Sequence, residues 1–226
     1  MKTVLKTLGL FTACLAAAPV WAQEYRVQEP LVSQVLEVRQ NRFELQSVNP
    51  RGNLCHLDGR LQGQGSRRFY QDNEGCSVDF VFGGKGVQVS IDDAHRQACQ
   101  QYCGHNAWMD GDYRRLPAAC SHQAEQRMEA RFQAAYRARR FNEAVAIKNG
   151  WFKQCESFAF LTTQMRARND LAAAYKNAGN KTACRQVLEP LRAEMEGSAD
   201  FEPTPLMAED YARELKAARF NWQACH

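Results

Sequence analysis

The spacing of the apolar residues changes near the middle of the chain. From about Arg42 to Ile91 apolar and polar residues alternate, as in CSVDFVF (76–82), whose even-numbered members are apolar and share one face. A period of two is typical of strands with one buried face. From Ser121 onward glycine and proline become scarce, and the apolar residues recur at helical spacing. The pattern therefore predicts an α+β protein in which a β part precedes an all-α part.

Five strands are expected in the β part, at 43–48, 54–61, 67–71, 76–82 and 87–91. The stretches NPRG (49–52) and GGKG (83–86) are turn sequences, the second of which makes a hairpin. Turns recur about every ten residues, which favours a small antiparallel meander with one buried face. Residues 23–41 are expected to be an N-terminal extension to it.

One helix is expected to pack on this meander. Asp92 or Ser90 can cap it, and Gly104 can end it in a left-handed conformation. Steps of four residues give this helix one stripe, made of Ile91, His95, Cys99 and Cys103. Gly111 and Pro117 then mark a loop at the domain boundary. The β domain is therefore expected over 42–118 and the helical domain over 119–226.

The helical part contains two similar segments. Ala135-Tyr136 with Ala144 recurs as Ala174-Tyr175 with Ala183, at an offset of 39 residues. The stretch LAAAYKNAGNKTACRQVLEPL (171–191) resembles a tetratricopeptide repeat, FNEAVAIKNG (141–150) is a looser copy, and a third pair would use 208–219. The resemblance covers about 100 residues. It implies stacked helical hairpins whose first helices line a concave surface that binds peptides or proteins.

The β part carries a second resemblance. CHLDG (55–59), C-x-V-x-F (76–80) and ACQQYCGHNAWMDGDY (98–113) are similar to a cysteine-containing domain of uncharacterised proteobacterial exported proteins. The resemblance implies export and supplies no activity.

Residues 1–22 have the three parts of a secretory signal peptide. Lys2 and Lys6 are followed by an apolar run from Leu8 to Ala18 and by small residues at Val20 and Ala22, so cleavage is expected after Ala22. A membrane anchor is disfavoured because the run is shorter than a bilayer requires. A lipoprotein cleaved before Cys14 is disfavoured because Phe11 stands where an aliphatic residue is usual. We expect a periplasmic or secreted protein without membrane insertion.

The charges of the chain nearly balance. The formal net charge is +4, and Lys2 and Lys6 supply two of those charges. This balance predicts no strong field for nucleic acid or for anionic membranes, so no nucleic-acid partner is expected.

The cysteine count favours four disulfides. Of nine cysteines Cys14 lies in the signal peptide, and an even number remains in an exported chain: Cys55, Cys76, Cys99, Cys103, Cys120, Cys155, Cys184 and Cys225. In a meander, the strands of the first two are separated by one strand, too far for a direct bond. They are therefore expected to pair with Cys99 and Cys103, in either order. In the helical part, Cys120–Cys155 and Cys184–Cys225 are expected.

The segment from Cys99 to Cys120 also offers three alternatives. Cysteine and histidine could bind zinc, but the C-x3-C spacing differs from the usual C-x2-C. Cys103 with His105 could form a nucleophile and base, yet residues two apart on a helix point in different directions. Asp110-Gly111-Asp112 lacks the further oxygen ligands of a calcium loop. No metal, cofactor or catalytic residue is therefore expected.

The predicted function is a non-catalytic module that binds a protein or peptide of the cell envelope. An inhibitor of an envelope-directed enzyme such as lysozyme, an enzyme acting on peptidoglycan, and a structural subunit of an envelope complex remain alternatives. Arginine grips carboxylates in a bidentate way, so an acidic peptide is the expected ligand. The residues expected to bind it on the first helices are Arg131, Arg139, Arg166, Arg168 and Lys176.

Overall fold

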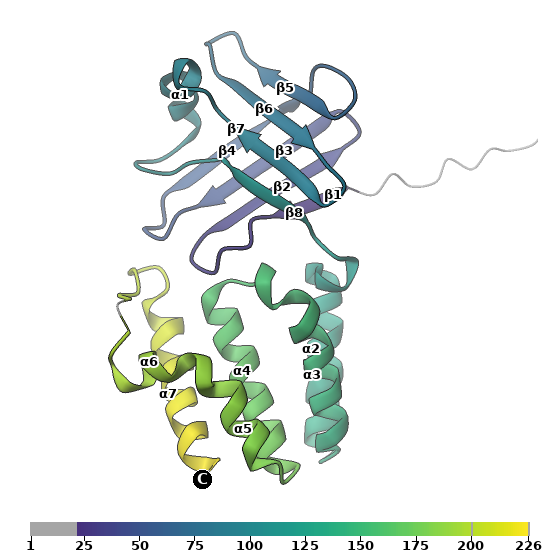
Figure 1. The fold of residues 1–226 in the computed structure, drawn as a ribbon, viewed down its shortest axis with the longest axis vertical. Helices are drawn as coiled ribbons and strands as arrows, with labels where there is room; N and C mark the ends of the chain where they lie inside the picture. The colour runs from purple at the N-terminus through teal and green to yellow at the C-terminus, as the bar shows by residue number, and fades with distance from the viewer. Residues whose placement is uncertain (1–21, 200, 226) are drawn as a thin grey trace, which may run out of the picture.

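The computed structural model describes residues 22–199 and 201–225 and consists of a β half stacked on a helical half (Figure 1). The predicted signal peptide, except for Ala22, lies outside these residues. Within them, no helix combines the length and the apolar character that crossing a membrane requires.

The β half contains one eight-stranded antiparallel sheet. Its strands are β1 (Gln23–Arg26), β2 (Ser33–Arg39), β3 (Arg42–Val48), β4 (Leu54–Arg60), β5 (Arg67–Gln71), β6 (Ser77–Phe82), β7 (Gly86–Ser90) and β8 (Gly111–Arg115). The order β4-β3-β2-β1-β8-β7-β6-β5 places β4 and β5 at the two edges. These edges meet at one bridge, where the backbones of Gln62 and Phe69 exchange hydrogen bonds of 2.7 and 3.1 Å. The sheet therefore coils around its own core.

Two sequence-based expectations for this half are wrong. Residues 23–41 are not an extension, because they form β1 and β2 inside the sheet. Residues 111–115 are not a loop, because they form β8, which joins β1 to β7. Both β1 and β8 are short and direct one buried apolar residue inward, Tyr25 and Tyr113 respectively. Such short strands carry no alternation that a sequence pattern can detect.

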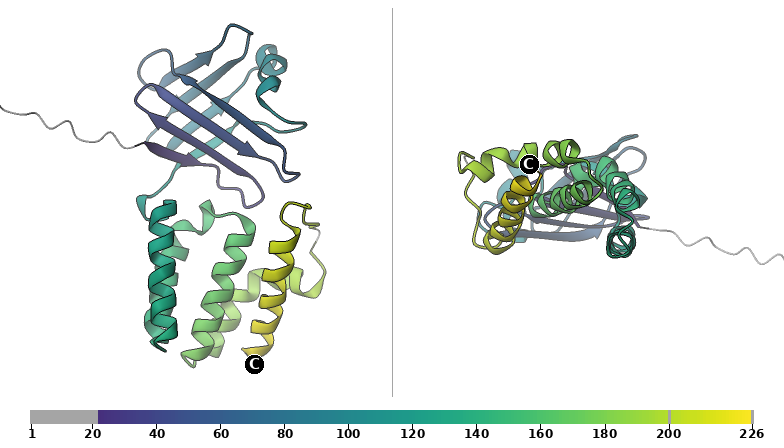
Figure 2. Two further views of the ribbon diagram at one scale, coloured as in Figure 1. Left: turned by 180° about the vertical axis from the view of Figure 1, so that it is seen from behind. Right: turned by 90° about the horizontal axis from the view of Figure 1, so that it is seen from below.

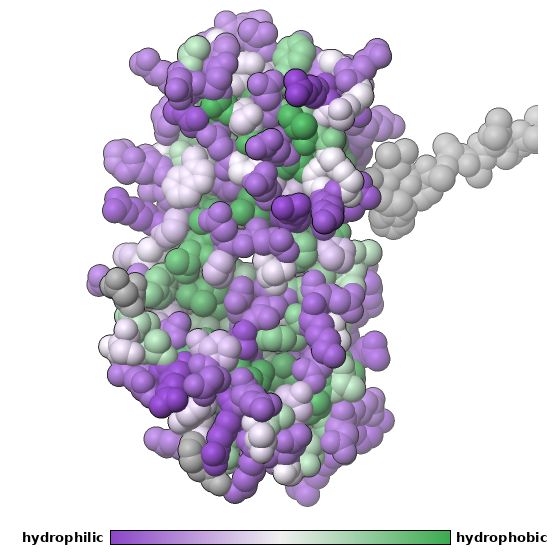
Figure 3. Space-filling view, viewed as in Figure 1, coloured by the Kyte–Doolittle hydropathy of each residue, from purple (hydrophilic) through white to green (hydrophobic). Residues whose placement is uncertain are grey.

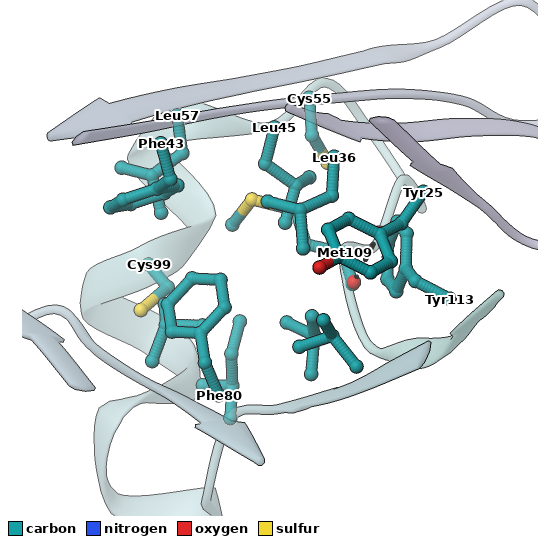
Figure 4. Packing of buried hydrophobic residues seen from close by; sticks show 14 of the residues in the cluster. Tyr25, Leu36, Phe43, Leu45, Cys55, Leu57, Phe80, Cys99, Met109 and Tyr113 are labelled. Carbon is teal, nitrogen blue, oxygen red and sulfur yellow. Dashed lines mark hydrogen bonds between the residues drawn. The ribbon is translucent and has the colours of Figure 1, made fainter. Parts of the chain in front are cut away.

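The core of the β half lies between the two sides of the coiled sheet (Figure 4). Phe43 of β3 and Phe80 of β6 meet across it with ring centroids 4.8 Å apart. The segment that precedes β8 enters the same core, where the Tyr113 hydroxyl donates to the Met109 carbonyl at 2.8 Å. Residues from both ends of the β sequence thus share one apolar interior.

A short helix and the turn that follows it are fastened to β4 and to the residue before β6. α1 (Asp93–Cys99) is capped by Asp92, whose carboxylate accepts from the His95 N–H at 3.0 Å, as expected. The chain continues as the 3₁₀ turn Gln100–Tyr102, and Gly104 does not take the expected left-handed conformation. Disulfides join Cys99 to Cys76, next to β6, and Cys103 to Cys55 in β4.

The pairing falls within the predicted scheme. Around the coiled sheet one strand, β5, lies between β4 and β6, because β5 pairs with β6 and its Phe69 bridges to Gln62 just after β4. The two disulfides connect β4 to the residue before β6 through the segment between Cys99 and Cys103. This segment therefore adds a covalent link between two edge regions that the described backbone joins at one isolated bridge.

Close contact between β7 and β8 requires a glycine at position 86. A Cβ atom there would lie 2.0 Å from the backbone oxygen of Tyr113. We expect Gly86→Ala to lower the free energy of unfolding by about 2–3 kcal/mol in denaturant titrations, because the two strands must separate. Gly84→Ala in the same turn, where a Cβ meets nothing within 4 Å, is the control and should change it by less than about 0.5 kcal/mol. Equal effects of the two substitutions would contradict this packing.

The helical half is built from two layers of helices. Its helices are α2 (His122–Arg137), α3 (Phe141–Cys155), α4 (Leu161–Asn177), α5 (Lys181–Leu188), α6 (Arg192–Glu196) and α7 (Ala208–Ala224). Seen from behind, α2, α4 and α7 lie side by side, with α3 and α5 in the other layer (Figure 2). Disulfides Cys120–Cys155 and Cys184–Cys225 are present as predicted. The first joins the start of α2 to the end of α3, and the second joins α5 to the end of α7.

The two halves contact each other through turns of the sheet. The Leu161 N–H donates to the Pro30 carbonyl at 2.7 Å, and Gln28 donates to the Ser157 hydroxyl at 2.7 Å. Leu206 lies beside Gly52 in the β3–β4 turn. Figure 3 shows apolar side chains at this junction, where Leu206 remains largely exposed.

Candidate functional site

A cleft of about 460 Å³ lies between α2 and α4, and α3 forms its floor. α2 contributes mainly polar side chains and α4 contributes Thr163, Arg166 and Ala167. The N–H of Ala124 donates to the Ser121 hydroxyl at 3.4 Å, which caps α2. With the Cys120–Cys155 disulfide, this cap fixes the end of the cleft nearest the β half.

Trp151 on the floor has an unsatisfied polar group. Trp151 is only 7% exposed. Its indole Nε1–H is buried and has no acceptor among the described residues. A buried donor without an acceptor costs about 1–3 kcal/mol. Beside it, the half-buried Glu125 carboxylate has no hydrogen-bond or ion-pair partner in the described chain. The cleft thus contains one donor and one acceptor that the described residues do not use.

The cleft continues toward the β half. A second hollow of about 140 Å³ shares Glu125, Trp151 and Thr163 with it and is also lined by Val27 and Val32 of the β1–β2 turn. The cleft therefore runs along the helices as far as the junction between the halves.

A buried lysine joins the three helices around the cleft. Lys148 of α3 is 3% exposed, and its Nζ donates to Glu129 of α2 at 2.5 Å and to Asp170 of α4 at 2.7 Å. Its Nζ also lies 4.3 Å from the ring centroid of Phe132. The group carries two negative charges and one positive charge; Lys148 is buried and Asp170 mostly so, whereas 40% of the Glu129 side chain is exposed.

The two carboxylates around Lys148 have opposite pKa shifts. Burial raises the pKa of Glu129, but hydrogen bonds from Lys148 and Gln133 outweigh it and the net pKa is lowered. Burial raises the pKa of Asp170, and Lys148 only partly offsets the rise. Opposite shifts occur in acid–base pairs of enzymes. Because both groups accept from a buried lysine and Asp170 does not line the cleft, we assign them a structural role.

A second polar group joins α4 to α7. Glu214 of α7 is buried and accepts from Arg166 Nε at 3.2 Å and from Asn169 Nδ2 at 3.1 Å. Asn221 in turn donates to the Asn169 carbonyl at 3.3 Å. The layer of α2, α4 and α7 is therefore held together by polar contacts as well as by apolar packing.

The five cations expected to bind a partner do not gather at one place. Arg166 lines the cleft, with about half of its side chain exposed. Arg131 is exposed on α2, Arg139 follows α2 with a left-handed backbone, and Lys176 is half-buried on α4. Arg168 points elsewhere, because it pairs with Glu156, donates to the Val187 carbonyl at 3.0 Å and covers the Phe152 ring.

Sequence patterns missed the residues that make the cleft distinctive. Nothing in the sequence pattern singled out Glu125 and Glu129, because carboxylates on exposed helix faces are common. Lys148 could have been singled out, because it occupies the apolar stripe of α3 together with Trp151 and Cys155. A lysine at a core position indicates buried carboxylate partners nearby.

The segment from Cys99 to Cys120 provides a scaffold. Cys99, Cys103 and Cys120 are all in disulfides, so none of them is a free thiol. In the described part of the chain, no group of three or more histidine, cysteine, aspartate or glutamate side chains is placed to hold a metal ion.

The fold and the cleft were compared with known proteins. The chain matches no protein family, no characterised protein and no solved structure. Its function is therefore inferred from its own residues.

Proposed function

We propose that this chain is an exported, non-catalytic module that binds an extended peptide segment of another envelope protein in the cleft between α2 and α4. The helical half would act as a tetratricopeptide-like array, with α2, α4 and α7 as the first helices of successive pairs. Four disulfides support a periplasmic or secreted location, where thiols are oxidised, together with the predicted signal peptide.

The unsatisfied Trp151 N–H and the unpaired Glu125 carboxylate carry this proposal. An extended peptide offers a carbonyl to the indole and an N–H or a basic side chain to the carboxylate. Arg166 on the facing wall would hold an acidic side chain of the same segment. Glu125 is unpaired, and Arg166, although its Nε is bonded to Glu214, keeps about half of its side chain exposed to the cleft. The two walls thus carry charges of opposite sign, so the preferred segment combines an acidic residue with a hydrogen-bond donor, a narrower class than the acidic peptide expected from the sequence.

A displayed library of random decapeptides tests the proposal. Glu125→Lys should weaken the binding of the selected peptides at least about tenfold, because it replaces a free acceptor with a cation. Trp151→Phe, which keeps an aromatic floor and removes the N–H, should weaken the same peptides. Fluorescence polarisation of a labelled peptide measures both effects, and thermal melting checks that the variants remain folded.

Glu209→Lys is the matched control, since Glu209 is an exposed residue of α7 outside the cleft. It should bind peptides as the unchanged protein does. The proposal fails if no decapeptide is enriched, or if Glu125→Lys and Glu209→Lys bind equally well. Clearing of peptidoglycan or inhibition of lysozyme by the purified protein would favour one of the alternative functions.

A further inference from the structure

A hollow of about 390 Å³ lies beside α1 in the β half, on the side of the sheet where α1 is attached (Figure 1). α1 and the turn after it form one wall, and the segment that leads into β8 forms the other. The volume falls within the range of ligand-binding pockets, about 300–1,000 Å³. The side chains that line the hollow include Ile91, Arg96, Asn106, Trp108, Met109 and Asp110.

The wall that leads into β8 is held in one conformation by buried side chains. The Gln34 amide donates to the Trp108 carbonyl at 3.0 Å. The Asn49 amide, which is also buried, donates to the Asn106 carbonyl at 2.9 Å. This wall is therefore ordered before a ligand arrives, which lowers the entropy cost of binding.

The same wall turns a tryptophan toward solvent. Met109 is 1% exposed and points into the core (Figure 4), whereas its neighbour Trp108 is 41% exposed. An aromatic ring that is rigidly supported but left uncovered at a hollow can anchor a ligand with little loss of side-chain entropy.

Polar groups around Trp108 are also left without partners. The side-chain amide of Asn106 has no hydrogen bond to the described chain, and its backbone is left-handed with a φ of 55°, which asparagine tolerates. Asp110 Oδ2 pairs with Arg96 at 2.8 Å, and Asp110 Oδ1 is buried without a donor among the described residues. Because Arg96 and Asp110 neutralise each other, the lining carries no net charge.

We propose that this hollow binds a neutral saccharide, with one pyranose ring packed on Trp108. The C–H groups on one face of a pyranose are slightly positive and suit the negative face of the indole ring. Sugar hydroxyls both donate and accept, so they match the side-chain amide of Asn106. This inference is independent of the peptide cleft, which lies in the helical half.

An extended peptide suits the hollow less well. Peptides that bind as strands pair with free backbone groups of the protein. Here the carbonyls of Asn106 and Trp108 already accept hydrogen bonds from buried amides. The groups that remain free are an aromatic ring and a side-chain amide, which favours a sugar. Glycans of N-acetylhexosamine and neutral hexose polysaccharides share this chemistry.

Isothermal titration calorimetry of the purified protein with neutral trisaccharides of glucose, mannose, galactose and N-acetylglucosamine tests the proposal. At least one should bind with a dissociation constant of about 1 mM or lower. Binding of the N-acetylglucosamine trisaccharide alone would indicate a glycan of N-acetylhexosamine, and binding of a hexose trisaccharide would indicate a polysaccharide.

Two substitutions in the hollow should weaken this binding. Trp108→Ala should weaken it at least about tenfold, because the ring that anchors the sugar is removed. Asn106→Gly should weaken it about fivefold, because it keeps the left-handed backbone and removes only the amide. Thermal melting checks that both variants remain folded.

The matched controls lie outside the hollow. Phe220→Ala removes an aromatic ring of α7 that is 66% exposed, and Gln40→Gly replaces an exposed residue with a φ of 58°. Both should bind the saccharide as the unchanged protein does, and so should Glu125→Lys in the peptide cleft. The proposal is overturned if no trisaccharide binds, or if Trp108→Ala binds as well as Phe220→Ala. It is also overturned if the selected decapeptides depend on Trp108 and not on Glu125, since the hollow would then be a peptide site.

Discussion

Replacing Cys55, Cys76, Cys99 and Cys103 together with serine is expected to leave the β half unfolded at about 37 °C. The two disulfides span 48 and 23 residues, for which loop-closure entropy gives about 4 and about 3 kcal/mol. Their sum is comparable with the whole stability of a typical domain, about 5–15 kcal/mol. The loss is local as well, because these bonds hold the segment that links β4 to the start of β6.

Hydrogen exchange measured by mass spectrometry can follow each half separately. Amides of β2, β3 and β6 should lose protection in the variant, while those of α4 should keep it. The control, Cys184→Ser with Cys225→Ser, breaks a bond that spans 41 residues between α5 and α7. It should reduce protection in the helices and leave the strands protected. Protected strands in the four-serine variant would show that the coiled sheet does not need this connection.

Replacing Lys148 with methionine is expected to lower the free energy of unfolding of the helical half by about 3–5 kcal/mol near neutral pH. The change keeps the apolar stem and removes the charge, so Glu129 and Asp170 face each other without a cation. Denaturant titration followed by circular dichroism at the helical band measures the loss. Lys153→Met on the exposed side of α3 is the control and should cost less than about 0.5 kcal/mol.

The loss should shrink as the pH falls and the two carboxylates take up protons. Neutralising them by Glu129→Gln and Asp170→Asn in the Lys148→Met background should recover most of the stability, because a buried neutral group costs less than an unpaired charge. If Lys148→Met is as stable as the unchanged protein at neutral pH, the lysine does not stabilise the helical half.

In the unchanged protein, Glu129 and Asp170 make opposite contributions to the pH dependence. The lowered pKa of Glu129 stabilises the fold above its unfolded pKa, and this contribution is lost as the pH falls through the folded value. The raised pKa of Asp170 favours folding at low pH, and that contribution is lost as the pH rises through its folded value. The two contributions to stability partly cancel. The variants above therefore test the role of Lys148, Glu129 and Asp170 better than the pH dependence of the unchanged protein does.

The sequence by itself determined the local structure of this protein. Alternation in 76–82 and 87–91 and helical spacing after Ser121 predicted strands and helices that are present. Cysteine parity predicted four disulfides, and the order of the elements predicted Cys120–Cys155 and Cys184–Cys225. These features can be predicted because periodicity is set by neighbouring residues and because an oxidising compartment leaves no thiol unpaired.

Only the tertiary structure decided which distant residues meet. The sequence left Cys55 free to bond to Cys99 or to Cys103, and the coiled sheet selected Cys103. β1 and β8, which pair locally with β2 and β7, also pair with each other across more than 80 residues of chain. The cleft beside Trp151 arises in the same way, from the packing of α2, α3 and α4. Such features depend on residues that no local period relates, and for that reason the fold, and not the pattern, placed the candidate sites.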